Sequence, residues 1–124
     1  MIGYVTLGTN DLARATRFYD KLLGEIGAKR SMENERFVAW SVAPGQPGLS
    51  LTQPFDGKPA SVGNGVMVAL AVKEPNQVNR LHALALELGG SDEGPAGPRG
   101  NGFYAGYFRD PDGNKLSFFC IAAG

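Results

Sequence analysis

A turn sequence near the C-terminus, Asp-Pro-Asp-Gly-Asn at positions 110–114, constrains this chain more than any other segment. Pro111 fixes one φ angle of the turn, Gly113 tolerates a positive φ, and the aspartates can accept hydrogen bonds from the backbone of the turn. Strand-forming residues flank the turn at 103–108 and at 116–121. The pattern therefore predicts a β-hairpin that reverses over these five residues.

The hairpin also has a predicted register. If Arg109 pairs with Lys115, then Tyr107 lies opposite Ser117, because side chains on one face of a ladder recur at every second residue. Phe119 follows Ser117 on the same face. Whatever this face contacts, Tyr107 and Ser117 contact it together.

Hydrophobic periodicity predicts that a β-α-β-β-β order occurs twice along the chain. The first copy has strands at 2–8, 27–31, 36–42 and 48–52, and a helix that is capped by Asn10 or Asp11 and ends at Gly24 or Gly27. The second copy has a strand at 66–72, a helix at 75–88, an irregular glycine- and proline-rich segment at 91–102 with room for a short strand, and the hairpin. The same alternation also fits a ferredoxin-like fold or an open α/β sandwich.

The length and composition bound what the chain can be. At 124 residues it is expected to be a single domain, with module one at about 1–53, a linker at about 54–64 and module two at about 65–122. Twelve basic and twelve acidic side chains give no net charge, so bulk electrostatics recruits neither nucleic acid nor an anionic membrane. No apolar run approaches the roughly 20 residues of a membrane span, and no leader pattern opens the chain, so we expect a cytoplasmic protein.

Four segments of the sequence form a specific set. They read YVTLGTNDL at 4–12, FYDKLLG at 18–24, GVMVAL at 65–70 and RDPDGN at 109–114. Together they resemble the glyoxalase, bleomycin-resistance and extradiol-dioxygenase group, the vicinal oxygen chelate superfamily, over nearly the whole chain. The resemblance implies an α+β fold in which two β-α-β-β-β modules curl mixed sheets around a central cavity, with the helices outside. It also implies a homodimer, which is common among members.

Enzymes of that superfamily bind one divalent metal through His or Gln, Glu, His and Glu on four strands. By the resemblance, these positions fall on Tyr4, Ser50, Met67 and Ser117 in this chain. A phenol, two hydroxyls and a thioether lack the charge and basicity that a divalent first-row metal requires, so we expect no metal and no other cofactor. The only histidine, His82, lies within the second predicted helix, where a packed or solvated side chain is the simpler interpretation.

In place of a metal site, strand alternation predicts a pocket that is apolar and aromatic with a few hydroxyl groups. Two arginines near its mouth could reach an acidic group of a ligand, because a guanidinium is shaped to fork a carboxylate. The predicted pocket residues are Tyr4, Thr6, Ser50, Thr52, Met67, Arg99, Tyr107, Arg109, Ser117 and Phe119. The large side chains among them could instead fill the hollow as core. Trp40 and Cys120 are expected to pack in the core.

Three functions fit these residues. The first is metal-free binding of a small hydrophobic or aromatic molecule, as in resistance proteins of the superfamily. The second is a glyoxalase-like lyase or isomerase, or a dioxygenase-like enzyme, that acts on a small carbonyl or aromatic substrate through unidentified metal ligands or through Tyr4 or Tyr107 as acid or base. The third is a dimerising interaction module whose cavity is filled. No catalytic residue is assigned.

Overall fold

The computed structural model describes residues 1–121, which form two compact units with the same order of elements. Unit 1 spans Met1–Val62, and unit 2 begins at Gly63. Unit 1 contains β1 (Tyr4–Gly8), α1 (Leu12–Gly24), β2 (Lys29–Asn34), β3 (Phe37–Ser41) and β4 (Gly48–Thr52). Unit 2 contains β5 (Val68–Ala71), α2 (Pro75–Glu87), β6 (Ser91–Pro98), β7 (Phe103–Arg109) and β8 (Lys115–Ile121). The predicted α+β fold of two β-α-β-β-β modules is confirmed.

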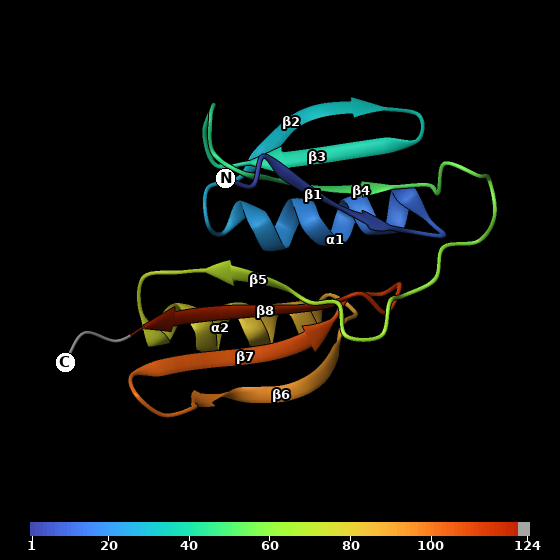
Figure 1. Ribbon diagram of the computed structural model, residues 1–124. Helices are drawn as coiled ribbons and strands as arrows, with labels where there is room; N and C mark the ends of the chain where they lie inside the picture. Colours follow the sequence, from blue (N-terminus) through green and yellow to red (C-terminus); the bar gives the residue numbers. More distant parts are fainter. Residues whose placement is uncertain (122–124) are drawn as a thin grey trace. The chain divides into compact units, whose positions relative to one another are not determined.

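Each unit has one mixed four-stranded sheet (Figure 1). The strand order is β1-β4-β3-β2 in unit 1 and β5-β8-β7-β6 in unit 2. In both sheets the first pair is parallel and the other two pairs are antiparallel. The registers correspond as well, since Thr6 lies opposite Ser50 in unit 1 and Ala69 lies opposite Ser117 in unit 2.

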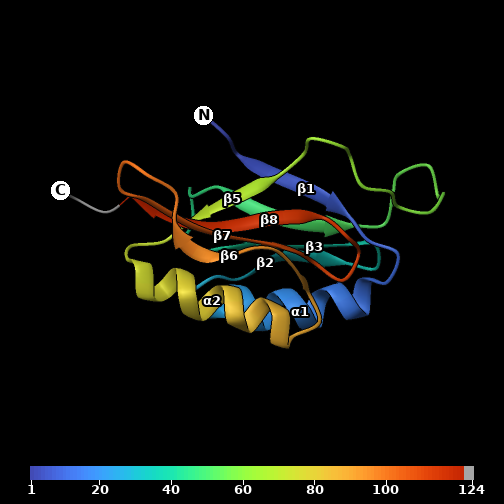
Figure 2. The same cartoon turned by 90° about the horizontal axis from the view of Figure 1, so that it is seen from below.

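In unit 1, Asp11 caps the start of α1, since its carboxylate accepts a hydrogen bond from the backbone N–H of Arg14 at 3.0 Å. The helix buries one apolar stripe, made of Ala15, Phe18, Tyr19, Leu22 and Leu23. Figure 2 shows each helix against one face of its own sheet. Strand alternation turns Leu7, Trp40, Leu49 and Leu51 to the helix-covered face of unit 1, where all four are buried.

In unit 2, α2 begins with Pro75 and buries Val78, Leu81 and Ala85. Proline suits the first turn of a helix because its missing N–H would have no helical partner there. Phe108 and Phe118 stack with ring centroids 5.6 Å apart and are fully buried.

The C-terminal hairpin has the predicted register: Arg109 pairs with Lys115 and Tyr107 with Ser117. One carboxylate oxygen of Asp110 accepts the backbone N–H groups of Asp112 and Asn114, both at 2.9 Å. The aspartate therefore organises the turn, as predicted.

Two strands differ from the expectation. β2 was expected at 27–31 but lies at Lys29–Asn34, and all six of its residues are exposed, so the segment has no apolar alternation to locate it. The segment at 91–102, expected to be irregular with at most a short strand, contains the eight-residue β6, whose pairing with β7 shifts twice. Residue 122, the expected end of module two, lies outside the described residues. Among residues 1–121 no helix is long and apolar enough to cross a membrane.

Candidate functional site

A groove of about 450 Å³ lies on the face of the unit 1 sheet that α1 leaves uncovered. The side chains that line this unit 1 groove are all uncharged. They belong to Gly3, Tyr4, Thr6, Ser31, Met32, Phe37, Ala39, Ser41, Gln46 and Gly48. A concave, largely apolar surface of this size with a few polar groups is typical of a small-molecule site.

Two large side chains of the groove are well exposed. Tyr4 is 70% exposed and Met32 is 62% exposed, whereas Phe37 is half-buried. Tyr4 lies opposite Gly48 in the β1–β4 ladder, and a Cβ atom added to Gly48 would be 3.6 Å from the Tyr4 Cβ and 3.3 Å from the Trp40 carbonyl oxygen. The missing side chain at Gly48 therefore leaves space beside the Tyr4 ring.

Three hydroxyl side chains, those of Thr6, Ser50 and Thr52, lie near Tyr4 on strands β1 and β4. Ser50 is fully buried, and its hydroxyl donates to the Val5 carbonyl oxygen at 3.0 Å. Because that bond uses the only proton of the Ser50 hydroxyl, the 3.0 Å contact between the hydroxyls of Thr6 and Ser50 is donated by Thr6. Thr52 donates to backbone oxygens of Arg36 and Gln53, so its hydroxyl proton is shared within the protein.

A neighbouring cavity of about 290 Å³ also lies in unit 1. Thr6 and Thr52 line it with residues of the segment that follows β4, among them Pro54 and Pro59. Thr6 thus borders both the groove and this neighbouring cavity, whereas Tyr4 lines only the groove.

In unit 2, the predicted pocket residues gather around Tyr107 on the sheet face that α2 leaves uncovered. The Arg99 guanidinium carbon lies 5.4 Å and the Lys115 ammonium nitrogen 5.6 Å from the centroid of the Tyr107 ring. Ser117 faces Tyr107 across the ladder and is 1% exposed. Next along this face, Phe119 stacks with Phe103, with 5.5 Å between the ring centroids. We call the group formed by Tyr107, Arg99, Lys115 and Ser117 the Tyr107 site.

Two other predicted pocket residues of unit 2, Arg109 and Met67, are not part of the Tyr107 site. Arg109 donates to the Glu93 carboxylate and to the Gly113 carbonyl oxygen, so its charge is matched within the protein. The hydrogen bond from Arg109 is the main cause that holds the pKa of Glu93 below its usual range, and the charges of Arg109 and Lys115 act in the same direction. Met67 precedes β5 and is partly exposed.

The donor set does not fit a divalent metal. The four positions that the sequence resemblance assigns to metal ligands carry a phenol and a hydroxyl in unit 1 and a thioether and a hydroxyl in unit 2, and the Ser50 proton is already donated. Within residues 1–121, no group of three or more His, Cys, Asp or Glu side chains is arranged to hold a metal ion. His82 is a buried residue of α2, and its Nε2 lies 3.0 Å from both the Asp92 carboxylate and the Tyr107 carbonyl oxygen.

Several residues of the unit 1 groove were not among the predicted pocket residues. Met32 comes after a shift in the β2–β3 register, so its face could not be inferred from alternation. Phe37 could have been found, because it alternates with the buried Val38. Gln46 lies in the turn between β3 and β4, where no periodicity applies.

Two β-α-β-β-β units, each with a mixed sheet covered by one helix, define the paired-module class of α+β proteins. Within this class, the family model described as Glyoxalase/Bleomycin resistance protein/Dioxygenase superfamily matches residues 1–118. The chain therefore belongs to this superfamily.

Solved structures agree with this assignment. A glyoxalase/bleomycin resistance protein from Albidiferax ferrireducens T118 is 36% identical, with a TM-score of 0.89, over 97% of this chain and 98% of that chain. A glyoxalase-related enzyme from Fulvimarina pelagi, 23% identical over 97% and 87% of the two chains, has a TM-score of 0.78. Lactoylglutathione lyase from Agrobacterium tumefaciens, 21% identical over 97% and 92%, has a TM-score of 0.72, and these two show the shared fold. None of the curated proteins matches the chain.

Proposed function

We propose that this chain is a metal-independent protein that binds a small hydrophobic or aromatic molecule in the unit 1 groove. The observation that carries the proposal is the combination of a hollow of about 450 Å³ with exposed Tyr4 and Met32 side chains on its walls. Covering such side chains with an apolar ligand removes their surface from water, which is favourable in proportion to the apolar area.

The chemistry of the groove favours binding over catalysis. No carboxylate, imidazole or thiol lines it among the described residues, so Tyr4 would be its only acid–base group. The groove is a hollow that the side chains of Tyr4 and Ser50, at the two proposed ligand positions of unit 1, do not fill. This supports a binding site over an interaction module with a filled cavity.

The proposal includes a cytoplasmic homodimer. Membership of the superfamily supports the dimer, and a lone buried Cys120 suits a reducing compartment because it needs no disulfide partner. Multi-angle light scattering of the purified protein will report twice the chain mass if the dimer forms.

Binding of an uncharged aromatic probe, 2-naphthol, tests the groove. We expect 2-naphthol to raise the thermal unfolding midpoint, because a ligand that binds only the native state stabilises it. Titration calorimetry should find affinity weaker by about tenfold in Tyr4→Ala and in Met32→Ala, since each truncation removes apolar contact area.

Phe55→Ala is the matched control, because Phe55 is fully exposed and does not line the groove. It should bind 2-naphthol as the unaltered chain does. Equal affinity for 2-naphthol in Tyr4→Ala, Met32→Ala and Phe55→Ala would contradict the proposal.

A further inference from the structure

We propose that unit 2 holds a separate binding site, at the Tyr107 site, for the carboxylate of a small planar organic acid. Two cations, from Arg99 and Lys115, lie within 5.6 Å of the centroid of one aromatic ring. A third residue, Ser117, offers a hydroxyl directly across the ladder from that ring. This inference concerns unit 2 alone and does not depend on the function proposed for the unit 1 groove.

Two glycines of β6 make room for the Arg99 side chain. A Cβ atom on Gly97 would lie 3.2 Å from Arg99 Nη1. A Cβ atom on Gly94 would lie 3.0 Å from Tyr107 Cδ2 and 3.6 Å from Arg99 Nη2. Side chains at these two positions would therefore displace the guanidinium or the ring.

The guanidinium of Arg99 is held in place by backbone oxygens. Nη2 donates to the Pro95 carbonyl oxygen, and Nη1 donates to the Pro98 carbonyl oxygen at 3.4 Å. Within residues 1–121 the Arg99 side chain donates only these two hydrogen bonds, so three of its five guanidinium N–H groups are available to an anion. A fixed guanidinium loses little freedom when it binds a carboxylate.

The charges around Tyr107 are unbalanced. Glu93, whose pKa the charge of Lys115 helps to lower, is already paired with Arg109. Neither Arg99 nor Lys115 forms an ion pair within 4.0 Å of a carboxylate in the part of the chain that the structure describes. A chain with twelve basic and twelve acidic residues thus leaves a local excess of positive charge beside one aromatic ring.

Ser117 adds a hydroxyl beside the cationic surroundings of the Tyr107 ring. The residue lies directly opposite Tyr107 in the β7–β8 ladder and is 1% exposed. A hydroxyl can both donate to and accept from an oxygen-bearing ligand.

The apolar surroundings indicate which kind of acid fits. Phe119 lies on the same face as Ser117 and stacks with Phe103, so a planar apolar body could lie against this pair while its carboxylate meets the cations. A guanidinium fork matches the two oxygens of a carboxylate. An aromatic monocarboxylate combines both properties.

Benzoate and its uncharged analogue benzamide test the site. We expect benzoate to shift the ¹⁵N–¹H signals of Gly94, Gly97 and the Arg99 Nε–H, and benzamide to shift them far less at the same concentration. Arg99→Gln and Lys115→Met should each weaken benzoate binding by about tenfold or more, because a charge-assisted hydrogen bond is lost.

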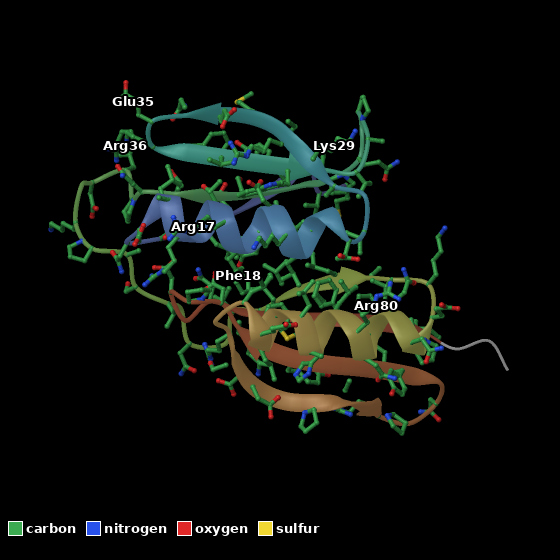
Figure 3. The ribbon with its side chains drawn as sticks, turned by 180° about the vertical axis from the view of Figure 1, so that it is seen from behind. Arg17, Phe18, Lys29, Glu35, Arg36 and Arg80 are labelled. Carbon is green, nitrogen blue, oxygen red and sulfur yellow. The ribbon has the colours of Figure 1, made fainter. Side chains whose placement is uncertain are left out.

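Arg80→Gln is the control, because Arg80 is an exposed arginine on α2, the helix on the other face of the same sheet (Figure 3). It should bind benzoate like the unaltered chain. Equal benzoate affinity in Arg99→Gln, Lys115→Met and Arg80→Gln, or equal affinity of the chain for benzamide and benzoate, would overturn the proposal. An unchanged unfolding midpoint in the variants will show that a loss of binding is not a loss of fold.

The two proposals fail separately. If Arg99→Gln loses benzoate binding but still binds 2-naphthol normally, the Tyr107 site is supported. This result does not depend on whether Tyr4→Ala weakens 2-naphthol binding. If inorganic phosphate produces the same shifts as benzoate at equal concentration, the site recognises charge without the planar body, and the carboxylate assignment is wrong.

Discussion

Single glycines decide which large side chains can lie on each face of the two sheets. Gly48 leaves space beside Tyr4, and Gly94 and Gly97 leave space for Arg99 and the Tyr107 ring. Gly106 has the same role on the helix-covered face of unit 2, where it faces His82. At each of these glycines, the missing Cβ atom leaves room for a neighbouring aromatic ring, imidazole or guanidinium group.

Gly106→Ala tests this packing. The added Cβ would lie 3.0 Å from His82 Cδ2 and 3.1 Å from Cγ, so the buried imidazole must move away from its contacts with Asp92 and the Tyr107 carbonyl oxygen. We expect a loss of about 1–3 kcal/mol in the free energy of unfolding, measured by chemical denaturation.

A second substitution identifies the imidazole as the cause. In the His82→Ala background, Gly106→Ala should cost less, because the imidazole ring is absent and only the Cβ atom of residue 82 remains close, at 3.2 Å. Gly3→Ala, at a glycine with open space around it, serves as the control. An equal cost in both backgrounds would show that the clash lies elsewhere.

One carboxylate connects three elements of unit 1. Asp20 of α1 accepts two hydrogen bonds from Arg30 of β2, at 2.6 and 3.0 Å, and one from the Trp40 indole of β3 at 2.9 Å. The hydrogen bonds from Arg30 are the main cause of the lowered pKa of Asp20. The hydrogen bond from Trp40 and the charge of Arg30 also lower this pKa, whereas partial burial of the carboxylate raises it. Arg30 stays charged because both carboxylates that it contacts, Asp20 and Glu33, raise its pKa.

This network predicts an acid dependence of stability. Because the pKa of Asp20 is lower in the folded chain than in the unfolded chain, its contribution is complete above the unfolded value and is lost as the pH falls through the folded value. The stability difference between the unaltered chain and Asp20→Asn should therefore shrink when the pH is lowered from 7 to 3. Urea denaturation at each pH measures it, with Glu87→Gln on the surface of α2 as control, and a difference that is constant over this range would contradict the role of Asp20.

The sequence predicted those elements that have a local chemical signal. The turn at Asp110, the cap at Asp11 and the proline at Pro75 gave the hairpin and the starts of both helices, and the apolar residues Leu49 and Leu51 on either side of a serine gave β4. β2 and β6 could not be located in this way. One is exposed throughout, and the other contains glycines and two shifts of register, so neither has the periodicity of a half-buried strand.

The candidate site was predictable to the same degree. Tyr4 and Thr6 were expected in a pocket and line the unit 1 groove, because β1 alternates regularly. Met32 was not expected, because its position depends on an irregular pairing. The hairpin register placed Lys115 opposite Arg109, but the approach of its ammonium group to Tyr107 depends on side-chain rotamers that a pattern does not specify.

Considered as a whole, the molecule repeats one topology with two different surfaces. The uncovered sheet face is uncharged around Tyr4 in unit 1 and cationic around Tyr107 in unit 2. Ser50 and Ser117 occupy the same register position in the two sheets, but only the Ser50 hydroxyl has an assigned hydrogen bond among the described residues. The same scaffold therefore supports a different polar chemistry in each half.

Metal removal tests the proposed metal independence of the entire chain. Dialysis against EDTA should change neither the thermal unfolding midpoint nor the affinity for 2-naphthol, because the residues at the four ligand positions are poor ligands for a divalent metal. Metal analysis by mass spectrometry accompanies the measurement. Stoichiometric Zn, Ni, Fe or Mn, together with a midpoint that falls on dialysis and recovers when the metal is restored, would contradict the proposal.

A pair of hydrogen bonds near the end of unit 1 has a practical consequence for protein engineering. The Asn10 side chain donates to the Ala60 carbonyl oxygen at 3.1 Å and accepts the Ala60 N–H at 2.6 Å, so the chain is bound to unit 1 as far as residue 60. Much of the predicted linker at 54–64 is therefore part of the first unit. A split reporter or a circular permutant should open the chain between Val62 and Gly63, since a cut before Ala60 would separate Ala60 from the preceding chain of unit 1, to which these two hydrogen bonds bind it.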